Sequence, residues 1–187
     1  MSRPMVVLNP EAYYIGKGKF VPNNPLPALV YRNVLPQLLS SETAQAFCEA
    51  NQWEKRGEWG PFWDAHFHPN THECYAIIQG SSRLVLRRER HDANLGGVEV
   101  DVKAGDVVVV PAGVSHRSLT AEGGYRYIGV YPKACLKWRN NWCKGKENMA
   151  LLEDEISKVI IPSHDPVYGE DGPLPVLWRK ASRDNKL

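Results

Sequence analysis

Five side chains able to bind a metal stand out by their spacing. Close together in the sequence lie His66, His68, His72 and Glu73, and His116 follows much farther along. Side chains on a β-strand alternate between faces, so His66 and His68 would project to the same side. A turn would then reverse the chain and bring Glu73 beside both imidazoles. Because imidazole nitrogens and carboxylate oxygens are good ligands for divalent transition metals, we predict a metal site formed by His66, His68, Glu73 and His116.

The alternation turns His72 away from this site, so we expect it behind the ligands or at the surface. With three neutral imidazoles and one carboxylate, a divalent ion would keep a formal charge of about +1 and up to about two open coordination positions. Such an ion attracts chelating oxygen donors, polarises a carbonyl or, if it is iron, activates dioxygen. We expect one divalent transition metal per chain, with iron favoured, although Mn, Zn, Ni and Cu accept the same donors.

The predicted ligands all lie between Trp59 and Tyr131. The sequence of this stretch is typical of short strands separated by turns that contain Gly, Pro and Asp. This pattern predicts an all-β, antiparallel sandwich or barrel at residues 57–132. The expected strands are 62–68, 73–79, 82–88, 98–102, 106–110, 115–120 and 125–131.

Side chains at even separations from the ligands should share their face and line the substrate space. These residues are Phe62, Asp64, Tyr75, Ile77, Gln79 and Ser118. The candidates for a catalytic role are Glu73, Tyr75 and Gln79.

The segments on either side of the barrel are expected to pack on it. In residues 1–56, three prolines within 21–27 exclude a helix and predict an extended arm. A strand at 28–34 and a helix at 41–55, capped by Ser40 or Ser41, should follow. In residues 133–187 we expect a short helix from Asn148 to about Val159, then a proline-rich tail that wraps the barrel and frays after residue 178.

Two motifs in the predicted barrel resemble the signatures of the cupin superfamily. The first comprises Gly60, His66, His68, Glu73 and Gly80, and the second comprises Gly105, Pro111, Gly113 and His116. The second motif usually ends in Asn, where this chain has Thr120. The segments 10–14, 21–34, 66–73, 104–116, 129–132 and 165–174 further resemble the YjlB-type single-domain cupins. The resemblance implies a double-stranded β-helix, or jelly-roll barrel, and a metal bound by the same four ligands.

Composition narrows the classes of function. The chain has 187 residues, a net charge of +2 with scattered basic residues, and no apolar run long enough to span a bilayer, which argues against a nucleic-acid or membrane protein. Its beginning lacks the apolar core of a secretory signal. Four dispersed cysteines form neither a disulfide framework nor a Cys-x-x-Cys pair. We therefore expect a cytoplasmic protein with reduced thiols.

These features favour a metal-dependent enzyme, and specifically an oxygenase or dioxygenase acting on a small chelating organic molecule. A non-redox isomerase, lyase or hydrolase is an alternative, and so is a metal-containing binding module without turnover. The four consecutive valines at 107–110 suggest a strand covered on both faces, by the N-terminal arm or by a second subunit. With the arm covering sheet edges, this predicts a homodimer.

Overall fold

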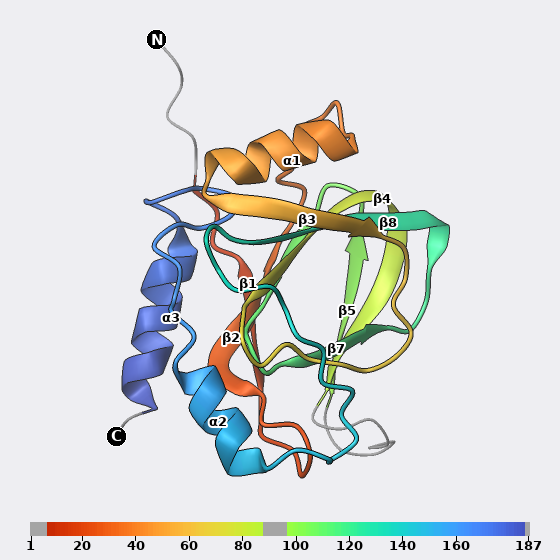
Figure 1. The fold of residues 1–187 in the computed structure, drawn as a ribbon. Coiled ribbons are helices and arrows are strands. Elements are labelled where there is room, and N and C mark those ends of the chain that lie inside the picture. The colour runs from red at the N-terminus through yellow and green to blue at the C-terminus, as the bar shows by residue number, and fades with distance from the viewer. Residues whose placement is uncertain (1–6, 88–96, 186–187) are drawn as a thin grey trace.

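A computed structural model describes residues 7–87 and 97–185 (Figure 1). One antiparallel sheet curls into a barrel, in the order β1-β2-β6-β4-β8-β3, and β5 and β7 also pair with β4. The strands are β1 (Glu11–Ile15), β2 (Asn24–Tyr31), β3 (Trp53–Trp59), β4 (Glu73–Arg87), β5 (Val98–Lys103), β6 (Val107–Val110), β7 (Ser115–Ser118) and β8 (Glu122–Pro132). The helices are α1 (Ser41–Ala50), α2 (Met149–Ser157) and α3 (Pro173–Asp184). None of these helices is long and apolar enough to cross a membrane.

Strand β4 organises the barrel because four other strands pair with it. Its first half pairs with β6 and β8, and its second half pairs with β5 and β7. The two halves had been expected as separate strands at 73–79 and 82–88, of which residue 88 lies outside the described residues. Gly80 lies between them with φ +64°, and the pairing with β8 shifts register between Ile77 and Gln79 and again between Gln79 and Ser81. The predicted turn is therefore a bulge, at which a single strand passes from one set of partners to the other.

Replacing Gly80 with alanine should lower the free energy of unfolding by about 3 kcal/mol. The positive φ disfavours any side chain, and a Cβ there would lie 2.2 Å from the carbonyl oxygen of Glu122. Gly60→Ala is the matched control, since its Cβ would meet nothing closer than 3.6 Å. Urea denaturation of both variants checks the difference. Equal stabilities would show that the bulge tolerates a side chain.

Two apolar layers enclose the sheet, and β6 contributes to both. Val107 and Val109 pack in the layer between the sheet and the helices, with Trp178 of α3. Val108 and Val110 pack inside the barrel, with Tyr75. The prediction that this strand is covered on both faces is thus confirmed. Within the described residues, side chains of this chain's own two apolar clusters cover the faces of β6, while β2 and β4 pair with its edges.

The helix expected at 41–55 begins as predicted but ends early. Ser40 is its N-cap, accepting a hydrogen bond from the Thr43 amide, and Asn51 is its C-cap. Gln52 then takes a positive φ of 64°, and the following residues form β3, which pairs with β8. The extension of the helix to residue 55 was therefore wrong, because pairing with a distant strand overrides the local helical spacing.

The boundaries of other predicted elements also differ from those in the structure. The strand expected at 28–34 runs earlier, as β2, and Asn33 in a left-handed conformation (φ 52°) follows its end. Of the strand expected at 62–68, only the bridges His66–His116 and Phe67–Asn141 form. Strand β1 was not predicted. Asn148 caps α2 as expected, and the helix ends at Ser157.

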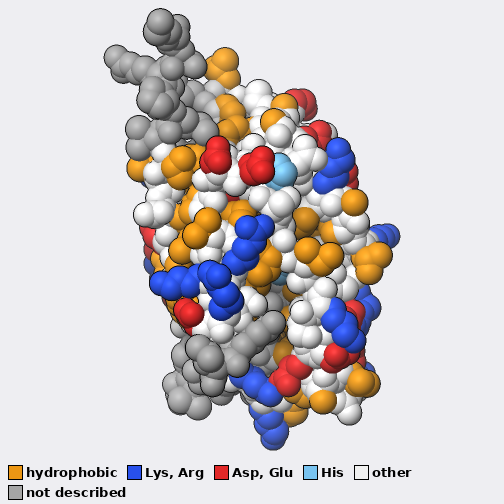
Figure 2. Space-filling view, turned by 90° about the vertical axis from the view of Figure 1, so that its left-hand side faces the viewer, with side chains coloured by type: hydrophobic (Ala, Val, Ile, Leu, Met, Phe, Trp, Pro, Cys, Tyr) orange, Lys and Arg blue, Asp and Glu red, His pale blue; other side chains and the backbone are white. Residues whose placement is uncertain are grey.

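The proline-rich tail ends in a helix, which had not been predicted. Pro173 and Pro175 lie in the first turn of α3, where missing amide donors cost nothing. Leu174, Trp178 and Ala181 are buried on one side of the helix, so the tail does pack on the barrel. The helix extends to Asp184, where fraying had been expected, and residues 186–187 lie outside the described residues. Figure 2 shows the side of the molecule on which Figure 1 draws α3; charged and hydrophobic side chains are mixed there.

Candidate metal centre

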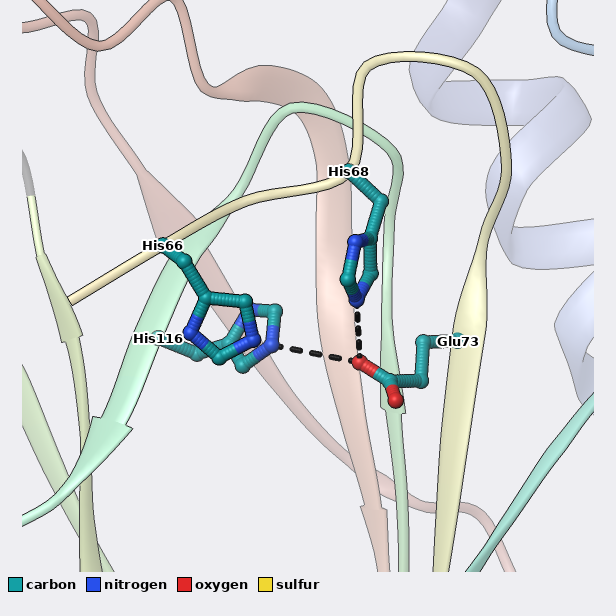
Figure 3. A group of neighbouring side chains, drawn as sticks. All are labelled: His66, His68, Glu73 and His116. Carbon is teal, nitrogen blue, oxygen red and sulfur yellow. Dashed lines mark hydrogen bonds and ion pairs between the residues drawn. The ribbon is translucent and has the colours of Figure 1, made fainter. Parts of the chain in front are cut away.

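The structure brings the four predicted ligands together. His66 and His68 come from the segment before β4, Glu73 is the first residue of β4, and His116 lies on β7 (Figure 3). All four are buried, and one potential ligand atom from each lies within 4.8 Å of the others. Reciprocal backbone hydrogen bonds between His66 and His116, of 3.3 and 2.9 Å, hold the two motifs side by side.

In each of the three histidines, Nδ1 lies beside a backbone carbonyl oxygen. Nδ1 lies 3.0 Å from the carbonyl oxygen of Asp64 in His66 and 2.9 Å from that of Val114 in His116. In His68 the corresponding distance, to the carbonyl oxygen of Arg139, is 3.2 Å. A carbonyl only accepts hydrogen bonds, so each Nδ1 carries the proton. Fixing the proton on Nδ1 leaves Nε2 as the atom that binds a metal, and such backing of a ligand is typical of histidine sites.

One buried nitrogen gives a direct test of whether a cation fits here. Nε2 of His116 lies 3.2 Å from Oε2 of Glu73, yet it makes no hydrogen bond with any described residue. Nε2 of His68 lies 2.9 Å from the same oxygen. Buried polar atoms are rarely left unsatisfied, and a cation among these atoms would satisfy both the nitrogen and the carboxylate. The donor set therefore fits a divalent metal.

For His66 and Glu73 the electrostatics favour the deprotonated forms that metal binding requires, whereas His68 beside Glu73 is favoured in its protonated form until a cation replaces the proton. Burial, together with the smaller effect of neighbouring His116, lowers the pKa of His66 to about 3. Burial raises the pKa of Glu73, but the charge and the hydrogen bond of His68 outweigh this effect, so the pKa of the carboxyl group lies well below its usual value. Burial also lowers the pKa of His68, but the charge and hydrogen bond of Glu73 raise it on balance. The group thus attracts positive charge.

Tyr131 fixes the orientation of the carboxylate. Its hydroxyl donates a 2.6 Å hydrogen bond to Oε1 of Glu73, which leaves Oε2 facing the imidazoles. Burial and the charge of Glu73 both raise the pKa of Tyr131, so the phenol keeps its proton. Sequence reasoning had not selected this residue, although strand alternation from the predicted 125–131 strand points to it.

Replacing Tyr131 with phenylalanine should weaken metal binding about tenfold, because groups that orient ligands typically contribute this much to affinity. Tyr125→Phe is the control: this tyrosine lies on the same strand, and its buried hydroxyl has no partner among the described residues. Competition with a chromophoric chelator measures both affinities. Equal losses in the two variants would contradict an orienting role for Tyr131.

His72 lies neither at the surface nor among the ligands. Its buried ring packs 4.6 Å from the ring of Trp178, and Nδ1 accepts a 3.0 Å hydrogen bond from the backbone amide of Ala112. The surface alternative was therefore wrong. Strand alternation did turn the side chain away from the cluster, and α3 covers it.

The pKa of His72 predicts a pH effect on the metal-free protein. Burial lowers this pKa from 6.5 to about 3, so between these values the unfolded chain binds a proton that the folded chain does not. The stability contributed by neutral His72 is complete above pH 6.5 and is lost as pH falls toward 3. Between pH 6 and 4, the free energy of unfolding should rise less steeply with pH in His72→Gln than in the wild type, by up to about 1.4 kcal/mol per pH unit. Urea denaturation at several pH values tests this, and an unchanged slope would refute it.

A pocket of about 210 Å³ opens beside the ligands. Around His66, His68 and Glu73 it is lined by Trp59, Phe62, Tyr127, Tyr131, Trp138 and Asn140. Of the residues expected to face substrate, Phe62 lines it, with its ring 4.4 Å from that of His66. The walls are mostly aromatic, which suits a flat organic molecule.

The other expected residues lie elsewhere. Tyr75, Ile77 and Ser118 are buried within the barrel; the ring of Tyr75 lies 5.8 Å from that of His116. Gln79 is exposed and donates to the carbonyl oxygen of Gly123, because the register shift after Ile77 ends the simple alternation. Asp64 is also exposed, since the chain there is not a strand. The inward positions expected for Gln79 and Asp64 are thus not observed.

Residues 55–124 match the family model described as a cupin domain. The chain carries a cupin domain. Over 171 residues it is 26% identical to "Uncharacterized protein YjlB" of Bacillus subtilis (strain 168), covering 91% of this chain and 97% of that protein. This cupin domain contains all four clustered side chains.

Solved structures similar to this chain include an oxalate decarboxylase of Lactobacillus farciminis in a formate complex, with a TM-score of 0.37 and 14% identity, covering 81% of this chain and 41% of that one. The vicilin of Solanum melongena has a TM-score of 0.36 and 18% identity, covering 57% and 33% of the two chains. The chain thus spans well under half of each of these proteins.

Proposed function

We propose that this protein is a metal-dependent oxygenase, acting as a dioxygenase on a small, planar organic molecule that chelates metal through oxygen. The cluster of His66, His68, Glu73 and His116 supports the metal, with iron favoured. In dioxygenation the substrate supplies the electrons and both oxygen atoms enter the product, so the reaction balances with substrate and dioxygen alone.

The ionisable groups around the pocket favour oxygenation over isomerase or lyase chemistry. Among its described lining residues, the only ionisable side chains besides the proposed ligands are tyrosines. Burial raises the pKa of both Tyr127 and Tyr131. Besides the proposed ligands, the described lining residues thus offer no side chain that titrates near neutral pH and could serve an isomerase or lyase as its acid or base. Oxygenation of a chelated, electron-rich substrate does not require a side-chain acid or base of this kind.

The chain's own residues would bind the substrate and exclude water. When bound, an iron ion would supply open coordination positions for a chelating substrate and dioxygen. Trp59, Trp138 and Phe62 offer apolar faces to a flat ligand, and they limit the water that reaches it. Tyr131 holds the carboxylate of Glu73 in place and keeps its own proton.

Elemental analysis and oxygen uptake together test the proposal. Protein purified without chelator or affinity metal should contain iron, and small chelating acids and phenols should include one that stimulates oxygen uptake. His116→Ala should abolish that uptake. Zinc as the bound metal, with no uptake for any compound, would instead favour non-redox chemistry and overturn the oxygenase assignment.

A further inference from the structure

The segment after β8 adds a wall to the pocket from outside the cupin domain. Within it, Trp138 and Asn140 line the pocket. The intervening Arg139 turns its side chain outward, to ion pairs of 3.0 Å with Glu147 and 2.7 Å with Glu155. Alternate side chains of this segment, which we call the 137–141 strap, therefore face the pocket and the solvent.

Hydrogen bonds fix the strap to the segment that carries two of the proposed ligands. Asn70 donates to the carbonyl oxygen of Lys137 and accepts from the amide of Arg139. Phe67 and Asn141 exchange backbone hydrogen bonds of 3.0 and 2.9 Å. The Arg139 carbonyl also accepts the hydrogen bond from Nδ1 of His68. The strap is thus held in register with the metal cluster.

Contacts with two neighbouring aromatic rings hold the ring of Trp138 in place. It stacks on Tyr131 with centroids 5.1 Å apart and planes 11° apart, and it meets Trp59 edge-on at 5.8 Å. An aromatic ring held in this way is a preorganised surface for a flat ligand, because it loses little freedom when the ligand binds.

Asn140 has an unsatisfied hydrogen-bonding atom in the same place. Its Oδ1 is buried and has no partner among the described residues. A buried amide oxygen without a donor costs free energy, and a ligand that donates to it recovers that cost. A site with such an acceptor discriminates against analogues that lack the donor.

From these observations we infer that the 137–141 strap selects the substrate: Asn140 accepts a hydrogen bond from an N–H or O–H group of a planar oxygen chelator that lies against Trp138. The inference rests on the proposed function, since the chelating oxygens need the metal. A pocket of about 210 Å³ fits a single-ring molecule of this class.

Two isosteric chelators test the role of Asn140. Both 3-hydroxy-2-methyl-4-pyridinone and 3-hydroxy-2-methyl-4-pyranone bind metals through two oxygens, but the first has a ring N–H where the second has a ring oxygen. Their dissociation constants are measured by calorimetry on zinc-loaded protein, which avoids turnover. The ratio of the two constants, compared between proteins, cancels their different intrinsic affinities for zinc. Asn140→Leu should reduce the preference for the pyridinone about tenfold.

The control variant is Asn140→Asp, which retains an acceptor oxygen and should retain the preference for the pyridinone. Should Asn140→Leu fail to fold by circular dichroism, Asn140→Ala replaces it. The same ratio in wild type and in the leucine or alanine variant would overturn the inference, and so would failure of both chelators to bind the zinc-loaded protein. Failure of the protein to retain metal is a separate result, because it overturns the proposed function itself.

Discussion

Protein carrying Glu73→Gln should bind its divalent metal more than about 100-fold more weakly than the wild type, since even groups that only orient ligands contribute 10–100-fold. Glu73 is the sole anionic member of the buried cluster. Glutamine preserves the shape of the side chain but removes the charge that compensates a buried cation. It also replaces one carboxylate oxygen with an NH2 group, which has no lone pair for a metal.

Elemental analysis after gel filtration and competition with a chelator measure this loss. Glu58→Gln is the matched control, because it removes an equivalent charge from β3, where Glu58 forms a 2.6 Å ion pair with Arg126. The control should retain the metal content of the wild type. Retention of metal by Glu73→Gln would rule out the proposed coordination, whatever the activity of the variant.

The ligand cluster could be predicted because its determinants are local. His66 and His68 differ by two residues, a separation that keeps them on one face even though only two isolated bridges form there. Glu73 begins the next strand, and His116 follows a turn at Gly113, where φ is +82°. Positive φ is inexpensive only for glycine, so the sequence itself marks where this strand begins.

The pocket walls depended on contacts that the sequence does not encode locally. Gln79 keeps an even separation from Glu73, yet the register shift after Ile77 places it outside. Trp138 and Asn140 reach the pocket because Asn70, His68 and Phe67 bind the backbone of their segment. No sequence pattern within residues 133–147 predicts these contacts, because their partners lie far away along the chain.

The same principle explains the errors in the flanking segments. The residues of β3 fit a helix end until their pairing with β8 is known. The tail's prolines suggested a continuous coil, but in α3 they occupy the first turn, where helices tolerate them. What fixes the start of α3 is a buried carboxylate, Asp165, whose role no motif indicated.

Replacing Asp165 with alanine should lower the free energy of unfolding by about 4 kcal/mol or more, which is exceptional for a single substitution. The side chain is fully buried. Its Oδ1 accepts from the amides of Val167 and Tyr168 at 2.8 and 3.1 Å. Its Oδ2 accepts from the Tyr31 hydroxyl at 2.5 Å and from the Leu174 amide at 3.0 Å. Alanine would leave all four donors buried without an acceptor.

The loss should extend to the metal centre through α3. Leu174 lies in the first turn of this helix, where a negative charge is also favoured by the helix dipole. Farther along, Trp178 packs on His72, the residue before Glu73. Asp165→Ala should therefore raise the metal dissociation constant as well as destabilise the fold, whereas Asp171→Ala, which removes an exposed carboxylate from the same segment, should change neither. Urea denaturation and chelator competition measure the two effects, and a stable Asp165→Ala protein with unchanged metal affinity would show that α3 does not support the cluster.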